Sequence, residues 1–85
     1  MRYAIEWLPQ AEDDLARIWM SRPGDSQAIN GAVNRIEREL RDNAHRKGAP
    51  VDNYRCYVDL PLKVLYVAIP DDNRVSIIEC RWVEC

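Results

Sequence analysis

Residues 62–83, LKVLYVAIPDDNRVSIIECRWV, decide the fold of this chain. Two runs rich in valine, isoleucine, leucine and tyrosine flank the polar segment PDDN at residues 70–73, and this arrangement is typical of a β-hairpin. Both alternating sets of side chains in the first run are apolar: Leu62, Val64, Tyr66 and Ala68 on one face, and Leu65, Val67 and Ile69 on the other. The pattern therefore predicts a central strand that is covered on both faces.

The beginning of the chain predicts a strand followed by a helix. Residues 2–7 alternate in the way that a β-strand does, and we expect this strand to join the terminal hairpin in one sheet. Pro9 ends it, because proline has no N–H for a strand ladder and suits the first turn of a helix. Apolar residues then recur at helical spacing, with carboxylates in the first turn, until Pro23 and Gly24 break the helix after residue 22.

A second helix and a further strand occupy the middle of the chain. Asp25 or Ser26 can cap the helix, which should fray near residues 43–47 and stop at Gly48. Residues 54–58 are typical of a strand. The predicted fold class is α+β in the order β-α-α-β-β-β, as one domain of residues 1–85 with a helical hairpin that can pack on one face of the sheet.

Composition excludes several classes of protein. The hydrophobic fraction of 47% and the charged fraction of 31% are those of a soluble globular chain. We expect a cytoplasmic protein, because no run is long and apolar enough for a membrane span and the N-terminus lacks a signal-peptide core. We expect no metal site and no small-molecule cofactor: Cys56, Cys80 and Cys85 lack C-x-x-C spacing, and His45 is the one histidine. Cys56 and Cys80 are expected to be reduced strand residues.

Charge is uneven along the chain, although the net charge is only −2. Residues 35–55 carry six basic and four acidic side chains, whereas residues 1–34 and residues 56–85 each carry three basic and five acidic ones. The net charge argues against a general polyanion binder. The basic zone is typical of an exposed helix face of mixed charge, and it leaves a contact with nucleic acid open.

In order and spacing, these segments resemble the RelE/ParE toxin superfamily of bacterial type II toxin–antitoxin systems. The resemblance covers nearly the whole chain: residues 3–7 (YAIEW), 11–15 (AEDDL), the arginine-rich second helix, 54–55 (YR), 62–66 (LKVLY), the polar turn at 71–72, 75–78 (VSII) and 80–82 (CRW). It implies a small twisted antiparallel sheet with an αα-hairpin on one face. The other face, with the groove beside the helices, would bind a cognate antitoxin. The residues expected to contact that partner are Leu65, Val67, Ile69 and Ile77.

The resemblance implies growth inhibition, a part in plasmid stabilisation, and one of two activities. RelE-like members cleave mRNA on the ribosome, and this chemistry needs cations that stabilise charge on the phosphate. The matching residues here are Lys63, Arg81 and Arg55 as catalytic cations, and His45, Arg46 and Lys47 as phosphate contacts. ParE-like members inhibit DNA gyrase by protein contact and need no catalytic residues. A homologue that binds an antitoxin without being toxic is the third alternative.

Each of these residues also has a purely structural interpretation. Lys63 could pair with Glu79 across the hairpin, and Arg81 and Arg55 could be ordinary surface charges. His45 could complement the dipole at the end of the second helix. Three features favour the ParE-like activity: the pattern at residues 11–15, the acidic balance, which repels ribosomal RNA, and the absence of a C-terminal tyrosine of the kind that RelE-like ribonucleases often have.

Overall fold

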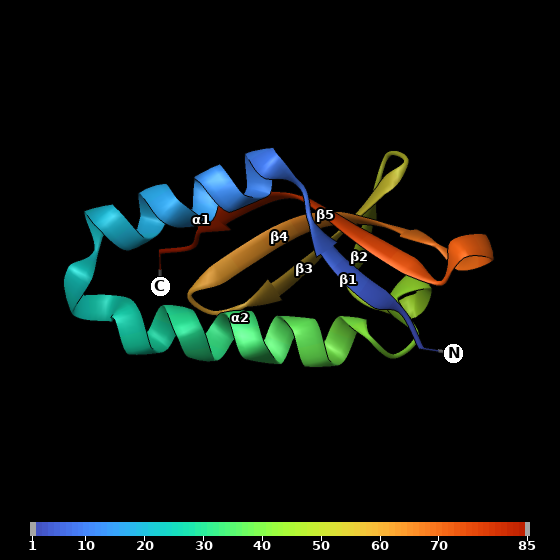
Figure 1. The fold of residues 1–85 in the computed structure, drawn as a ribbon, viewed down its shortest axis with the longest axis horizontal. Helices are drawn as coiled ribbons and strands as arrows, with labels where there is room; N and C mark the ends of the chain where they lie inside the picture. The colour runs from blue at the N-terminus through green and yellow to red at the C-terminus, as the bar shows by residue number, and fades with distance from the viewer. Residues whose placement is uncertain (1, 85) are drawn as a thin grey trace.

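Residues 2–84 are described by the computed structural model, and they form one sheet and two helices (Figure 1). The helices are α1 (Pro9–Ser21) and α2 (Ser26–Leu40). The strands, in chain order, are β1 (Ala4–Trp7), β2 (Ala49–Val51), β3 (Tyr54–Asp59), β4 (Leu62–Ile69) and β5 (Arg74–Trp82). Three short 3-10 turns lie between them: η1 (Pro23–Asp25), η2 (Ala44–Arg46) and η3 (Pro70–Asp72). The expected order of elements is confirmed, with β2 as an additional strand.

The strands form a mixed five-stranded sheet in the order β1-β5-β4-β3-β2, so β4 lies at its centre. Neighbours from β2 to β5 are antiparallel, whereas β1 runs parallel to β5, from Ala4 opposite Arg74 to Trp7 opposite Ile77. The expected α+β class and the position of the first strand beside the hairpin are confirmed. The expectation of a wholly antiparallel sheet is wrong in one pairing, because the long intervening chain supplies the crossover that parallel neighbours require.

The hairpin of β4 and β5 contains one irregularity, between the pairs Leu65–Glu79 and Tyr66–Ile77. Ile78 has no partner on β4, so β5 carries an extra residue there, as in a β-bulge. The alternation of side chains along β5 changes phase at this residue. Ile77 therefore faces the helices, whereas Glu79 faces the opposite side of the sheet.

The core lies between the sheet and the two helices, which form the arms of a hairpin (Figure 1). Helix α1 lies against β5, and α2 lies against β3 and β4. Apart from Ala44 in η2, the fully buried side chains come from one stripe of each helix and one face of the sheet: Ala11, Ile29, Ala32, Ile36, Leu40, Leu62, Val64, Tyr66, Val75 and Ile77. None of the helices within residues 2–84 combines the length and the apolar character that a membrane crossing requires.

Tyr66 on β4 forms hydrogen bonds with the segment that follows α2 and so connects this segment to the sheet. Its hydroxyl oxygen lies 2.8 Å from the carbonyl oxygen of Ala44 and 2.7 Å from that of Lys47. Arg55 adds a 2.6 Å hydrogen bond from Nε to the Lys47 oxygen. Gly48 has a φ of 67° and leads the chain into β2. The helix-covered face of the sheet is therefore fixed by polar contacts at this end as well as by the apolar core.

Candidate functional site on the open face of the sheet

The sheet has a second face that the two helices do not cover, called here the open face. Side chains of directly paired residues point to the same side of a sheet, so the pairing of β3, β4 and β5 defines its members. They are Cys56 and Val58 on β3, Lys63, Leu65, Val67 and Ile69 on β4, and Arg74, Ser76, Glu79 and Arg81 on β5. The apolar ones on β4 are only half-buried. The sequence predicted that both faces of β4 are covered, but in the structure only the face toward the helices is.

Two cations predicted as catalytic, Lys63 and Arg81, are direct partners across β4 and β5. Both are exposed, and Val58 is the partner of Lys63 on its other side. Glu79 lies opposite Leu65, so the alternative pairing of Lys63 with Glu79 does not form. Among residues 2–84, Lys63 has no carboxylate within salt-bridging distance. The structure thus brings two like charges together at one end of the open face.

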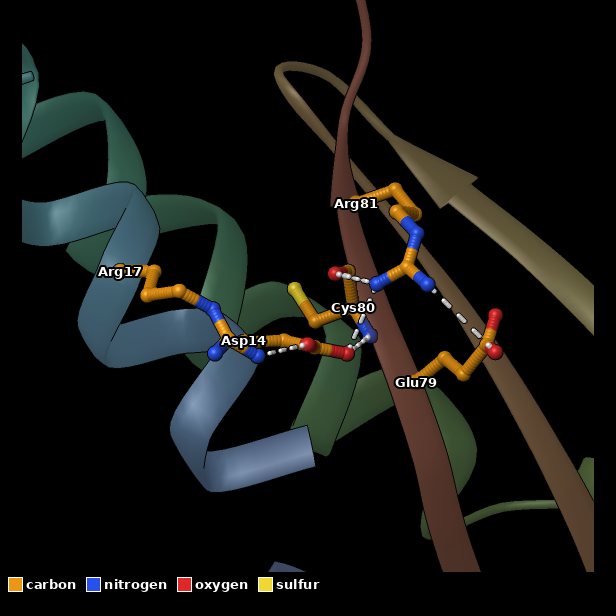
Figure 2. Close-up of polar contacts among 5 residues, drawn as sticks. All are labelled: Asp14, Arg17, Glu79, Cys80 and Arg81. Carbon is orange, nitrogen blue, oxygen red and sulfur yellow. Dashed lines mark hydrogen bonds and ion pairs between the residues drawn. The ribbon is translucent and has the colours of Figure 1, made fainter. Parts of the chain in front are cut away.

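Arg81 is held by groups on both sides of β5, as Figure 2 shows. Its Nη1 donates to Oδ2 of Asp14 at 2.9 Å and to the carbonyl oxygen of Cys80 at 3.2 Å. Its Nη2 lies 3.5 Å from Oε1 of Glu79. The guanidinium is therefore oriented before any ligand arrives.

Asp14 occupies a gap at the edge of the sheet. β1 pairs with β5 only as far as Ile77, and beyond that point α1 lies beside the edge of β5. The Asp14 carboxylate, with 7% of its side chain exposed, accepts the Cys80 N–H at 3.2 Å and a 3.0 Å hydrogen bond from Nη2 of Arg17. The Asp14 side chain thus supplies the acceptor that a neighbouring strand would otherwise supply to Cys80. From the sequence, Asp14 was expected only to interact favourably with the dipole of the first helix.

The contacts of Asp14 determine its ionisation. Burial would raise the pKa of its carboxyl, but the hydrogen bonds from the Cys80 amide and Arg17, together with the charge of Arg81, outweigh burial. The pKa of Asp14 is therefore lowered from the ordinary value of 3.8. Burial also raises the pKa of the neighbouring Cys80 thiol to about 11, so this thiol is neutral and unreactive.

Arg55, the third predicted cation, lies on the helix-covered face. Its partner on β4 is Tyr66, and its guanidinium donates to the carbonyl oxygens of Lys47 and Gly48. These bonds close the loop after α2. The structure does not bring Arg55 together with the pair formed by Lys63 and Arg81.

The predicted phosphate contacts lie in and just after η2, which packs against β4 through Tyr66 on the helix-covered side. His45 Nδ1 lies 2.8 Å from the Tyr3 hydroxyl, and Lys47 Nζ donates to Oε2 of Glu39 at 3.0 Å. Arg46 is exposed. These residues are therefore separated from the open face by the sheet itself.

Of the four residues predicted to contact a partner, Leu65, Val67 and Ile69 lie on the open face. Ile77 does not, because it is completely buried in the core as the partner of Tyr66. An unbroken alternation from Arg81 and Glu79 would place Ile77 on the open face, and the bulge at Ile78 prevents this. The unpaired Ile78 is half-buried, and Val58 on β3 is 50% exposed. Sequence reasoning missed both of these apolar residues.

A groove of about 370 Å³ lies on the helix side, between α1 and α2. Its lining is mainly apolar, with two carboxylates: Trp7, Leu15, Ala16, Trp19 and Val33, with Glu12 and Glu37. Trp7 Nε1 donates to Oε2 of Glu37 at 2.8 Å, which fixes one wall. Among residues 2–84, no group of three or more histidine, cysteine, aspartate or glutamate side chains is arranged to hold a metal ion.

Two solved structures resemble this fold closely. A chain in the structure of the toxin–antitoxin complex RelBE2 from Mycobacterium tuberculosis superposes with a TM-score of 0.76 at 14% identity, over 96% of this chain and 92% of that chain. A chain of a chromosomal ParDE toxin–antitoxin system from P. aeruginosa also gives a TM-score of 0.76, at 15% identity, over 98% of both chains. No protein-family model and no curated sequence matches this chain.

The chain therefore has the RelE/ParE-like fold, as the resemblance in its sequence predicted. The similarity extends over nearly the full length of the matched chains, so it includes the sheet and the helical hairpin.

Proposed function

We propose that this chain is the toxin of a type II toxin–antitoxin system, and that a cognate antitoxin neutralises it by covering the open face. The observation that carries the proposal is the row of half-buried apolar side chains on β4, Leu65, Val67 and Ile69, on the face that no helix covers. Apolar patches of this kind mark binding surfaces. The fold shared with chains of two toxin–antitoxin complexes gives the partner its class.

The groove between α1 and α2 supports the same partner. Its two tryptophans and three aliphatic side chains offer the kind of apolar, aromatic surface that is enriched at the centre of protein interfaces. Trp19 in this groove is 40% exposed, and the next residue in the chain, Met20, is 82% exposed. An antitoxin that occupies both the groove and the open face has to pass around an edge of the sheet.

For the activity itself we propose inhibition of DNA gyrase by protein contact. Lys63 and Arg81 on the open face, and Arg17 on α1, are accompanied by two carboxylates, Asp14 and Glu79, so the cluster carries a net formal charge of only +1. A nuclease needs surplus positive charge and a group that moves protons. The one histidine, His45, lies on the other side of the sheet and contacts Tyr3.

Cleavage of mRNA is the second candidate, and one observation favours it. Lys63 and Arg81 are direct neighbours across two strands, which is the placement that stabilisation of one phosphate requires. Glu79 beside Arg81 is the carboxylate available as a base. The two candidate activities differ in their dependence on these cations. Removal of Lys63 or Arg81 should abolish mRNA cleavage but leave gyrase inhibition intact.

The two activities are separated by expressing Lys63→Ala and Arg81→Ala beside the unmodified chain. If gyrase is the target, we expect both variants to stay toxic and the purified chain to inhibit supercoiling of plasmid DNA by gyrase. If RNA is the target, each variant is expected to lose roughly two to three orders of magnitude in cleavage rate. Primer extension on translated mRNA during induction measures that cleavage.

Arg38→Ala is the matched control, because Arg38 is an exposed arginine on α2, outside the cluster. New mRNA ends in the wild type and in Arg38→Ala that vanish in Lys63→Ala and Arg81→Ala would reject the gyrase proposal. Inhibited supercoiling with unchanged mRNA would support it.

A further inference from the structure

The pair formed by Lys63 and Arg81 is unfavourable in the free chain. Like charges directly opposite each other on antiparallel strands destabilise a sheet, because their Cβ atoms are only about 4.5–5.5 Å apart. Lys63 gains no compensating carboxylate among residues 2–84, and Arg81 alone is bonded to Asp14 and Glu79. An anion that lies between the two side chains would convert this repulsion into attraction.

Arg81 keeps N–H donors that have no hydrogen-bond acceptor among residues 2–84. Nη1 is used by Asp14 and the Cys80 carbonyl, and Nη2 lies beside Glu79. Within the described part of the chain, Nε of Arg81 and Nζ of Lys63 have no hydrogen-bond acceptor. Asp14 is a positioning residue here, since its buried carboxylate holds the guanidinium in one orientation.

The surroundings of the pair are aliphatic. Val58, half exposed, is the partner of Lys63 on β3, and Leu65 follows on the same face of β4. The residues directly paired with Lys63 and Arg81 include no aromatic ring on which a nucleotide base could stack. This lining suits the aliphatic side chains of a protein segment better than it suits RNA.

The charge balance also favours a protein ligand. Lys63, Arg81 and Arg17 exceed Asp14 and Glu79 by one positive charge, so one added negative charge neutralises the site, whereas a nucleic acid brings a charge at each phosphate. A peptide with a single carboxylate flanked by apolar residues fits both the charge of this site and its aliphatic lining.

We propose that Lys63 and Arg81 bind an aspartate or glutamate carboxylate of the antitoxin, on a segment whose aliphatic side chains lie on Val58 and Leu65. This inference rests on the proposed function, because it names the chemistry by which the neutralising partner recognises the open face. Electrostatic contacts of this type fix the register of a bound segment and exclude wrong partners.

The test is calorimetric titration of the purified chain with the product of the reading frame next to its own gene. Lys63→Ala and Arg81→Ala are each expected to weaken binding roughly tenfold, whereas Arg38→Ala is expected to bind as the wild type does. The aspartate and glutamate residues of the partner are then changed one at a time to the corresponding amide. We expect one of these changes to weaken binding by the same factor. When that amide change in the partner is combined with Lys63→Ala, the affinity should fall little further, because the two changes remove the same contact. The melting temperature of Lys63→Ala should be unchanged or raised, which separates lost contact from lost folding.

Three results would count against the proposal in different ways. Equal affinity of the wild type and both variants for the partner would overturn the carboxylate site and leave the proposed function standing. Failure of the wild type to bind the neighbouring product would remove the proposed function itself. Binding of a fluorescent single-stranded RNA by the wild type, lost in Lys63→Ala, would reassign the pair to a phosphate.

Discussion

Replacement of Gly48 by alanine is expected to lower the free energy of unfolding by about 2–5 kcal/mol. Gly48 has a φ of 67°, a backbone conformation that costs a residue with a side chain about 1–2 kcal/mol. An added Cβ would also lie within 2.2 Å of the Cys56 carbonyl oxygen. That oxygen belongs to β3, which is fixed between β2 and β4, so the clash cannot be relieved by a side-chain movement. Urea unfolding followed by circular dichroism measures the loss.

Gly24→Ala is the control for this substitution. Gly24 lies in η1, has no positive φ, and has no atom within 4 Å of the position that a Cβ would take. Its replacement is expected to leave the unfolding free energy unchanged or to raise it slightly, through a smaller entropy of the unfolded chain. If Gly48→Ala unfolded at the same urea concentration as Gly24→Ala, the described path of the chain from η2 into β2 would be wrong.

Replacement of Asp14 by alanine is expected to cost about 1–3 kcal/mol at neutral pH. The main loss is the buried Cys80 N–H, which would have no acceptor. Arg17 and Arg81 lose a partner too, but both are more than half exposed and regain water. Asp13→Ala is the control on the same helix, because Asp13 is exposed, and its expected effect is within about 0.5 kcal/mol.

The contribution of Asp14 should depend on pH in a defined direction. The folded-state pKa of Asp14 lies below 3.8, so the ionised carboxylate stabilises the folded chain above that value. The stabilisation is lost as the pH falls below 3.8 and passes through the lowered folded-state pKa. The difference in unfolding free energy between the wild type and Asp14→Ala should therefore shrink on acidification. A difference that grew at low pH would contradict the assigned contacts.

The elements that local sequence determines were predicted closely. β4 begins at Leu62 and ends at Ile69, as its apolar run between two prolines indicated. Helix α1 begins at Pro9 and ends next to the predicted break at Pro23. In these segments periodicity and proline act on neighbouring residues, so no knowledge of the tertiary structure is needed.

The end of α2 was predicted less well, for a tertiary reason. The helix stops at Leu40, before the residues 43–47 that were expected to fray and well before the expected end at Gly48, and Asn43 adopts a left-handed conformation with a φ of 57°. Ala44 then becomes fully buried, and its carbonyl accepts from Tyr66. A contact with a strand more than twenty residues away in sequence leaves no local signal.

The candidate site depended on the register of the hairpin, which the turn sequence did not specify. The structure places Lys63 opposite Arg81, so these two predicted cations are together, whereas Arg55 lies on the other face. The bulge at Ile78 moved Ile77 into the core, and a period-two pattern cannot reveal one extra residue. Asp14 was not predicted as a site residue because two of its donors, the Cys80 amide and Arg81, lie more than sixty residues away in sequence.

The central claim, that this chain is a toxin restrained by a partner, is tested most directly by growth of a bacterial culture. Induction of the chain alone is expected to stop growth, and co-expression of the protein encoded by the neighbouring reading frame is expected to restore it. Gly48→Ala, which should fold poorly, serves as the control that growth arrest requires the folded chain. Unchanged growth, with the chain expressed and folded, would contradict the account and leave a homologue that binds an antitoxin without being toxic.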